Sequence, residues 1–151
     1  MHSDNQFFPA AEGLSHVAIR TRDILESIRF YTEILGLREA FRMYREDGSL
    51  STIYLYVGEG GFLEIFDGGT KEQQADQSTI GYCHVCYEVD DIEAAYRKVQ
   101  DLGAPIDVPL RTGMAKCLLF YTHDPDGNAV ELMQLPEESL QAQAIKRLEG
   151  E

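Results

Sequence analysis

The sequence has little of several features that define whole classes of protein. It holds three cysteines and no long apolar run, and its 13 basic residues are opposed by 26 acidic ones. Without about 20 consecutive apolar residues a helix cannot span a bilayer, and the first residues lack the basic and apolar regions of a secretion signal. The formal net charge of −13 argues against binding to nucleic acid and to anionic membrane surfaces. We therefore expect a cytoplasmic protein whose partners include neither nucleic acid nor a membrane.

The three cysteines are Cys83, Cys86 and Cys117, an odd number that suits a reducing compartment. Cys83 and Cys86 form a C-x-x-C pair, which structural zinc sites and redox sites use. No second pair completes a zinc finger, and two strand positions three apart point to opposite faces. The sequence therefore favours small core residues over a zinc or redox motif.

Two segments of the chain carry a histidine and a glutamate at nearly the same separation. Glu64 follows His16 by 48 residues, and Glu131 follows His84 by 47. One structural unit is therefore used twice, and each copy contributes one imidazole and one carboxylate. Two imidazoles and two carboxylates suit a divalent transition metal that keeps positions open for substrate. The pattern predicts a metalloenzyme in which His16, Glu64, His84 and Glu131 bind one metal ion.

The hydrophobic pattern predicts the same order of elements, βαβββ, in both halves. Helices begin at the capping residues Asp23 and Asp91 and end at Gly36 and Gly103. The expected strands lie at about 14–21, 38–45, 50–57 and 61–67, and then at about 82–89, 105–109, 116–122 and 128–135. We expect an α+β fold in which two tandem βαβββ modules form curved mixed sheets around a metal-binding cleft.

At 151 residues the chain suits one domain made of two joined modules. We expect a single domain over 13–136, with module 1 at about 13–68, a polar linker at about 68–79 and module 2 at about 80–136. Residues 137–151 are expected to form a C-terminal helix or tail.

Alternation along the strands tests the metal hypothesis. Leu63 and Ile65 flank Glu64, and aliphatic residues likewise flank Glu131. In a half-buried sheet the aliphatic neighbours pack on the helices while the glutamates face a cleft. Tyr54 and Tyr56 share one face of their strand by the same rule. The alternative, that the four ligand candidates are ordinary strand residues, does not explain their matched type, face and repeat position.

The motifs together resemble a known family. Leu14–Arg20 with Asp23 and Leu35-Gly-Leu37, then Gly81–Asp91, and finally Asp124-Pro-Asp-Gly127 followed by Glu131, are similar to the two half-motifs and the closing strand of glyoxalase I. Over about residues 13–136 the chain therefore resembles the vicinal oxygen chelate superfamily, which includes glyoxalase I, methylmalonyl-CoA epimerase, extradiol dioxygenases and drug-resistance proteins.

The resemblance implies a metal site and a reaction. The metal positions of the family map onto His16, Glu64, His84 and Glu131, and the His-Glu-His-Glu set resembles that of bacterial glyoxalase I. This pattern implies one divalent ion (Ni, Zn, Co, Mn or Fe) and enolisation of a small substrate with vicinal oxygens, from a 2-oxoaldehyde thiohemiacetal to a 2-hydroxyacyl thioester. Glu131 is the first candidate for the base and Glu64 the second.

The resemblance also implies substrate contacts. Arg20 and Lys116 fall where glyoxalase I places cations for the glutathione moiety, and Tyr54 and Tyr56 are further candidates, with packing as their alternative role. Gly68 stands where the glyoxalase I pattern has asparagine, and Cys83 where it has glycine or histidine. The chain is thus closer to that pattern at its metal positions than at those that recognise glutathione.

Other functions of the same fold remain alternatives. They are a metal-dependent epimerase of the methylmalonyl-CoA type, an extradiol-type dioxygenase, and, in a different class, a metal-free drug-binding resistance protein. Because the resistance proteins usually lack ligands at these positions, the four present here favour an enzyme. Relatives of this length build each site from two chains, so we expect a homodimer with shared active sites.

Overall fold

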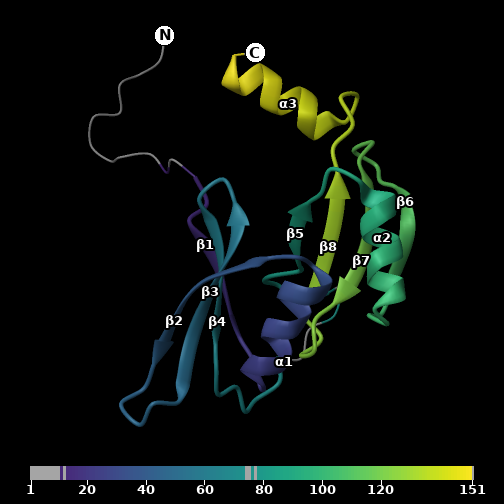
Figure 1. Ribbon diagram of the computed structural model, residues 1–151. Helices are drawn as coiled ribbons and strands as arrows, with labels where there is room; N and C mark the ends of the chain where they lie inside the picture. Colours follow the sequence, from purple (N-terminus) through teal and green to yellow (C-terminus); the bar gives the residue numbers. More distant parts are fainter. Residues whose placement is uncertain (1–10, 12, 74–75, 77, 151) are drawn as a thin grey trace.

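The computed structural model describes residues 11, 13–73, 76 and 78–150 (Figure 1). Residues 74, 75 and 77 of the expected linker, and residue 151 of the expected tail, lie outside this part. The elements in chain order are β1 (His16–Arg20), α1 (Ile24–Arg29), η1 (Phe30–Ile34), β2 (Arg38–Tyr44), β3 (Leu50–Gly58), β4 (Gly61–Phe66), β5 (Val85–Glu88), α2 (Ile92–Asp101), β6 (Val108–Thr112), β7 (Leu118–His123), β8 (Ala129–Gln134) and α3 (Leu140–Glu149). None of the described helices is both long and apolar enough to cross a membrane.

Each module forms a four-stranded mixed sheet, and the two sheets have the same topology. The strand orders are β1-β4-β3-β2 and β5-β8-β7-β6. In both sheets the first and last strands of the module are parallel neighbours, and the remaining pairs are antiparallel. The prediction of an α+β fold with two βαβββ modules is confirmed.

Aspartates begin the helix of each module, as the sequence predicts. Asp23 accepts hydrogen bonds from the backbone N–H groups of Leu25 and Glu26 at 3.0 and 3.2 Å. Asp91 accepts one from Ala94 at 2.9 Å. These bonds satisfy amide donors that have no partner inside the first helical turn.

The first helix differs from the expectation in its second half, where α1 continues as the π-helix η1. There the N–H of Leu35 donates to the carbonyl of Phe30 at 3.2 Å, one residue wider than an α-helical bond. The hydroxyl of Thr32 donates to the carbonyl of Ile28 at 2.7 Å, a side-chain bond that bends helices. The helix then ends at Gly36, whose φ of +80° suits glycine.

Two strands begin later than the sequence predicts. β5 begins at Val85, the first residue that pairs with β8, where its partner is Val130, so His84 precedes the strand. β6 begins at Val108, not near 105, because the preceding residues close the end of α2. Ala104 there donates its N–H to the carbonyl of Val99 at 3.1 Å.

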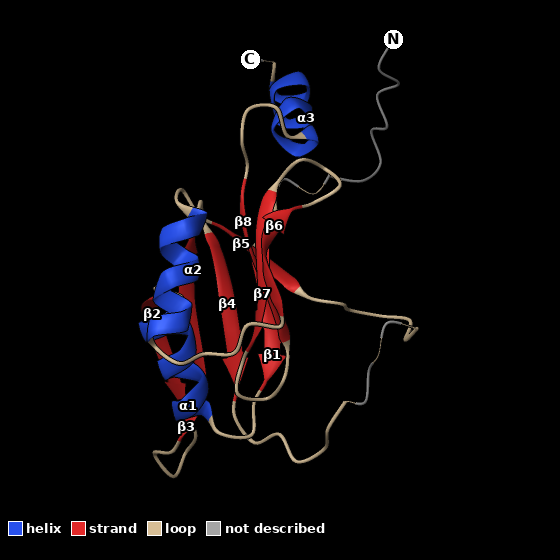
Figure 2. Cartoon of the chain, turned by 90° about the vertical axis from the view of Figure 1, so that its right-hand side faces the viewer, coloured by secondary structure: helices blue, strands red, loops and turns tan. Residues whose placement is uncertain are grey.

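The core lies between the sheets and the helices. The aliphatic residues beside the two glutamates, and their partners on neighbouring strands, are at most 3% exposed: Ile53, Leu55, Leu63, Ile65, Val130 and Leu132. This burial confirms the faces that alternation predicts. Figure 1 places α1 between the two sheets, and Figure 2 shows α1 and α2 on the same side of β7 and β8.

A buried polar joint connects the modules. The hydroxyl of Tyr31, which follows α1, donates to the carboxylate of Asp124 at 2.8 Å in the turn between β7 and β8. Asp124 also accepts from the backbone N–H groups of Asp126 and Asn128 at 3.0 and 2.9 Å. Asp126 in turn accepts from the hydroxyl of Thr21. Because Tyr31 and Asp124 are at most 1% exposed, the phenol depends on this carboxylate for its hydrogen bond, and the carboxylate loses a buried donor if the phenol is removed.

Removing the phenol at this joint should destabilise the protein. We expect Tyr31→Phe to lower the free energy of unfolding by about 1–3 kcal/mol, because the buried carboxylate of Asp124 loses a donor. Urea unfolding followed by circular dichroism measures the change. Tyr96→Phe, which alters a ring packed on Phe120, is the control and should shift the curve much less. Equal losses in the two variants would contradict the role of the joint.

Candidate functional site

Module 1 brings His16 and Glu64 together. His16 begins β1, Glu64 lies in β4, and Ala18 of β1 pairs with Glu64 in the parallel register. The Nε2 atom of His16 lies 3.4 Å from a carboxylate oxygen of Glu64. The glutamate side chain is 10% exposed and the imidazole 41%, so the pair lies at the sheet surface with its carboxylate covered.

Module 2 repeats this arrangement with closer contacts. His84 lies directly before β5, and Glu131 in β8 pairs with Cys86 of β5. The Nε2 atom of His84 lies 2.8 Å from a carboxylate oxygen of Glu131. The glutamate side chain is 5% exposed and the imidazole 34%. The repeated spacing in the sequence therefore corresponds to two equivalent half-sites.

The four expected ligands do not meet within one chain. Among the described residues there is no group of three or more histidine, cysteine, aspartate or glutamate side chains that could hold a metal ion. The structure thus brings His16 to Glu64 and His84 to Glu131, and it keeps the two pairs apart. Each pair supplies one nitrogen and one oxygen donor, which is half of a transition-metal site.

The surroundings of both carboxylates fit a bound cation. Glu64 and Glu131 are 7% and 4% exposed as whole residues, and carboxylates are almost never this buried without a partner. Their only ion pairs within the described part of the chain are with His16 and His84, and neither glutamate is paired with lysine or arginine there. A divalent ion would supply the missing positive charge.

A tyrosine flanks each glutamate on the neighbouring antiparallel strand. Tyr54 pairs with Glu64 and Tyr121 pairs with Glu131 in the registers of the two sheets. A hydrogen bond with Glu64 raises the pKa of Tyr54. Burial and then a hydrogen bond with Glu131 raise the pKa of Tyr121 to about 12. Both phenols therefore stay protonated at neutral pH and can donate to the carboxylates.

Cys86 adds a thiol to the half-site of module 2. Partial desolvation, and then the charge of Glu131, raise the pKa of this thiol to about 12. A hydrogen bond between the thiol and Glu131 contributes to the same shift. Cys83 and Cys86 are both exposed free cysteines. The expectation that these two cysteines are small core residues is therefore wrong, and the register shows that β5 turns Cys86 toward the same sheet face as Glu131.

The candidate substrate-binding residues lie in three places. The guanidinium of Arg20 lies 5.0 Å from the ring centre of Phe66 and donates to the carbonyl of Asp67 at 2.9 Å. Tyr56 contacts the guanidinium of Arg38, which lies 5.1 Å from its ring centre. Lys116 is exposed in the turn between β6 and β7.

An open aromatic row crosses the sheet face of module 1 beside His16. The ring of Tyr54 stacks on Phe41 at 4.5 Å and lies 5.9 Å from the imidazole of His16. Phe62 continues the row, at 6.0 Å from Tyr54 and 5.5 Å from Tyr56. Phe41 is 47% exposed and the other three rings are partly exposed, so the described residues leave this apolar face only partly covered.

The chain matches the Glyoxalase/Bleomycin resistance protein/Dioxygenase superfamily over residues 13–132. It belongs to that superfamily. It is 31% identical to the uncharacterized protein YwbC of Bacillus subtilis, over 82% of this chain and 98% of that one. It is 28% identical to a lactoylglutathione lyase of Schizosaccharomyces pombe, over 82% of this chain but only 48% of that protein. The structure resembles a glyoxalase family protein from Enterococcus faecalis, with a TM-score of 0.68 and 26% identity over 81% of this chain and 97% of that one.

Two residues beside Glu131, Tyr121 and Cys86, were not among the candidate site residues predicted from the sequence. Tyr121 follows Tyr54 by 67 residues, the same offset that separates Glu64 from Glu131. Applied to every residue of the repeat, this offset would have found Tyr121. Alternation would have found Cys86, which lies two residues after His84.

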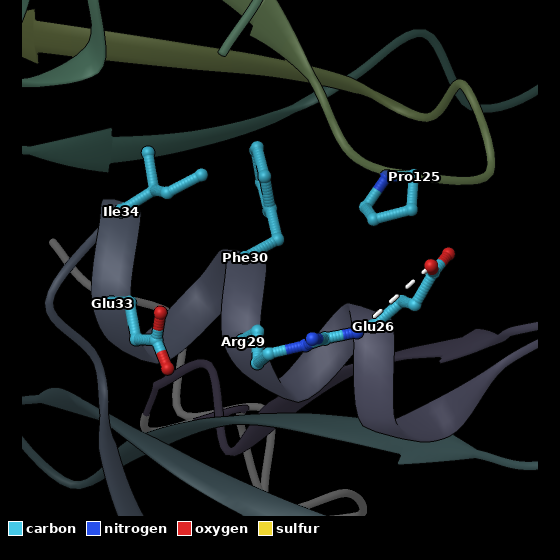
Figure 3. A pocket seen from close by; sticks show the side chains of 6 residues that line it. All are labelled: Glu26, Arg29, Phe30, Glu33, Ile34 and Pro125. Atoms are coloured by element: carbon cyan, nitrogen blue, oxygen red, sulfur yellow. Dashed lines mark ion pairs between the residues drawn. The ribbon is translucent and has the colours of Figure 1, made fainter. Parts of the chain in front are cut away.

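A shallow cavity of about 280 Å³ lies elsewhere on this superfamily domain, along α1 and η1 (Figure 3). Its lining is Glu26, Arg29, Phe30, Glu33, Ile34 and Pro125. Because neither histidine–glutamate pair contributes to it, this cavity is not the expected metal-binding cleft.

The Cys86 thiol should report the charge on Glu131. At pH 8 a thiol with a pKa of about 12 has roughly a thousandfold less thiolate than one at 9.0. We expect iodoacetamide to alkylate Cys86 slowly in metal-free protein despite its exposure. Glu131→Gln should speed the reaction several-fold, but not to the rate of an ordinary thiol, because desolvation remains. Peptide mass spectrometry measures the rate, and no change in the variant would contradict the contact.

Proposed function

We propose that this protein is a divalent-metal-dependent enzyme of the glyoxalase I type. The observation that carries the proposal is the pair of equivalent half-sites, each a buried glutamate beside a histidine with no lysine or arginine in its ion pairs among the described residues. The proposed reaction is the isomerisation of a 2-oxoaldehyde thiohemiacetal to a 2-hydroxyacyl thioester. The name of the S. pombe relative, lactoylglutathione lyase, supports this reaction class.

The proposed cofactor is one divalent ion per site, Ni, Zn, Co, Mn or Fe. The residues that would hold it are His16, Glu64, His84 and Glu131, two neutral nitrogens and two carboxylates. When bound, such an ion polarises the oxygens of a substrate and makes the neighbouring C–H bond more acidic.

The glutamates would carry the proton. Glu131 is the first candidate to remove the proton from the carbon that bears the thiol group and to return it to the adjacent carbon, with Glu64 as the second candidate. The transfer leaves the atoms of the substrate unchanged in number, so no further reactant is needed. Burial of both carboxylates keeps bulk water from exchanging with this proton.

The remaining candidates would orient the substrate. Arg20 and Lys116 are the cations proposed to bind the carboxylates of the thiol moiety, and Tyr54 and Tyr56 the aromatic residues proposed to line its path. The row of rings beside His16 offers an apolar surface for the carbon chain of the aldehyde. Gly68 leaves the position of the usual asparagine without a side chain, so the thiol moiety need not be glutathione.

We further propose that each site is shared by two chains of a homodimer. His16 and Glu64 of one protomer would meet His84 and Glu131 of its partner. Two observations support this: the pairs form no larger ligand group within the described chain, and the aromatic face of module 1 is only partly covered there. A second copy would cover that face and complete the ligand set.

Metal content tests the proposed function directly. Protein purified without chelators should contain about one divalent ion per chain, since a dimer has two sites. His16→Ala and Glu131→Gln should each lose most of the metal and all measurable turnover, while circular dichroism stays unchanged. Mass spectrometry measures the metal, and a panel of thiohemiacetals, acyl-CoA thioesters and catechols measures turnover. Wild-type protein that binds no metal would be evidence for a metal-free binding protein.

Mixing two inactive variants tests the shared site. When His16→Ala and Glu131→Gln chains are unfolded and refolded together, one of the two sites in each heterodimer receives only intact modules. About a quarter of the wild-type activity should return, because about half of the dimers are mixed. The matched control mixes His16→Ala with Glu64→Gln, which both damage module 1, and it should restore nothing. Failure of the first mixture in a protein that binds metal as a monomer would exclude sharing.

A further inference from the structure

The two glutamates have matching neighbours on one side. Each occupies the strand position opposite a tyrosine, Tyr54 for Glu64 and Tyr121 for Glu131. Each tyrosine ring also meets the histidine of its own half-site edge-on, at centroid distances of 5.9 Å in module 1 and 5.2 Å in module 2. Histidine, glutamate and tyrosine thus form the same three-residue cluster in both modules.

On the other side the neighbours differ. Ala18 is the strand partner of Glu64, whereas Cys86 is the strand partner of Glu131. The methyl group of alanine cannot donate a hydrogen bond, whereas the register places the thiol of Cys86 on the neighbouring strand and on the same sheet face as the carboxylate. Two further observations agree with the difference: the histidine–glutamate distance is 2.8 Å in module 2 and 3.4 Å in module 1, and the Glu131 side chain is half as exposed.

We propose that Tyr121 and Cys86 are positioning residues that hold the Glu131 carboxylate from both neighbouring strands, while Tyr54 alone holds Glu64. A carboxylate accepts several hydrogen bonds, so donors on the two neighbouring strands would restrict its rotation while its contact with His84 is kept. The residues that hold metal ligands in this way typically change metal affinity or activity 10- to 100-fold when they are removed. This inference rests on the proposed function.

For the proposed function, this difference implies that Glu131 and Glu64 have different roles in the proton transfer. A base that removes a proton from one carbon and returns it to the next must keep its orientation throughout the transfer. Of the two carboxylates, Glu131 has the donors to do so. This gives Glu131 a structural reason to be the first candidate for the base, beside the reason that the family resemblance gives.

Cobalt binding to the 151-residue protein tests the proposal without relying on turnover. Tyr121→Phe and Cys86→Ala should each weaken Co²⁺ affinity about tenfold and lower kcat more than they change KM. Cys86→Ser keeps a donor and should stay near wild type. Tyr96→Phe and Cys83→Ala are matched controls, one on α2 and one exposed beside His84, and both should bind Co²⁺ like wild type.

The substitution Tyr121→Phe, made in the Glu131→Gln variant, distinguishes an effect through the carboxylate from an effect on packing. If the residues act through the carboxylate, Tyr121→Phe should have little further effect on Co²⁺ affinity there. A full tenfold effect in that background would overturn the proposal. The proposal would also be overturned if Tyr121→Phe and Cys86→Ala both bound Co²⁺ as tightly as the wild type does. In either case the proposed function would still stand, provided that the wild-type protein binds metal and is active. A wild type that neither binds Co²⁺ nor turns over a thiohemiacetal would remove both.

Discussion

Burying a carboxylate is unfavourable unless a positive charge or hydrogen-bond donors compensate for the lost water, and this protein does it twice. Glu64 and Glu131 face away from the aliphatic core, yet both are less than a tenth exposed. Their compensation in the described chain comes from one imidazole and one phenol each, with a thiol added for Glu131. Neither glutamate is paired with lysine or arginine in the described chain. A divalent cation would supply positive charge at both carboxylates, which is why the burial of these two residues is central to the proposed function.

The joint around Asp124 connects the two modules within one chain. Tyr31 and Thr21 of module 1 donate to aspartates in the turn of module 2, and α1 lies between the sheets (Figure 1). In the described chain the two histidine–glutamate pairs form no larger ligand group. In the proposed dimer a second chain would supply the other half of each ligand set while the joint within each chain stays intact. The proposal of sharing therefore requires no rearrangement of the two modules.

Much of this arrangement could be predicted from the sequence, because it depends on local patterns. Alternation along strands placed Leu63 and Ile65 in the core and Glu64 on the opposite face, and capping aspartates gave the helix starts. The π-helical end of the first helix could not be predicted, since it depends on the bond from Thr32 to Ile28 and on packing. The late start of β5 depends on where its pairing with β8 begins, at Val85 and Val130, which is a contact between distant segments. The role of Cys86 could not be predicted for a third reason. A C-x-x-C pair suggests metal or redox chemistry, and only the strand register shows that Glu131 is the neighbour of Cys86.

The differences between the modules carry more information about mechanism than their similarity does. Repetition explains why histidine, glutamate and tyrosine recur at fixed offsets, since each module has the same sheet. Repetition does not explain why module 1 has Ala18 where module 2 has Cys86, each as the strand partner of a candidate ligand. A symmetric site would suffice to bind a cation. In the proposed proton transfer, by contrast, one carboxylate acts as the base and keeps its orientation while it removes and returns the proton. The shorter histidine contact of Glu131 and its thiol neighbour Cys86 distinguish this carboxylate from Glu64 in a way that fits such a role.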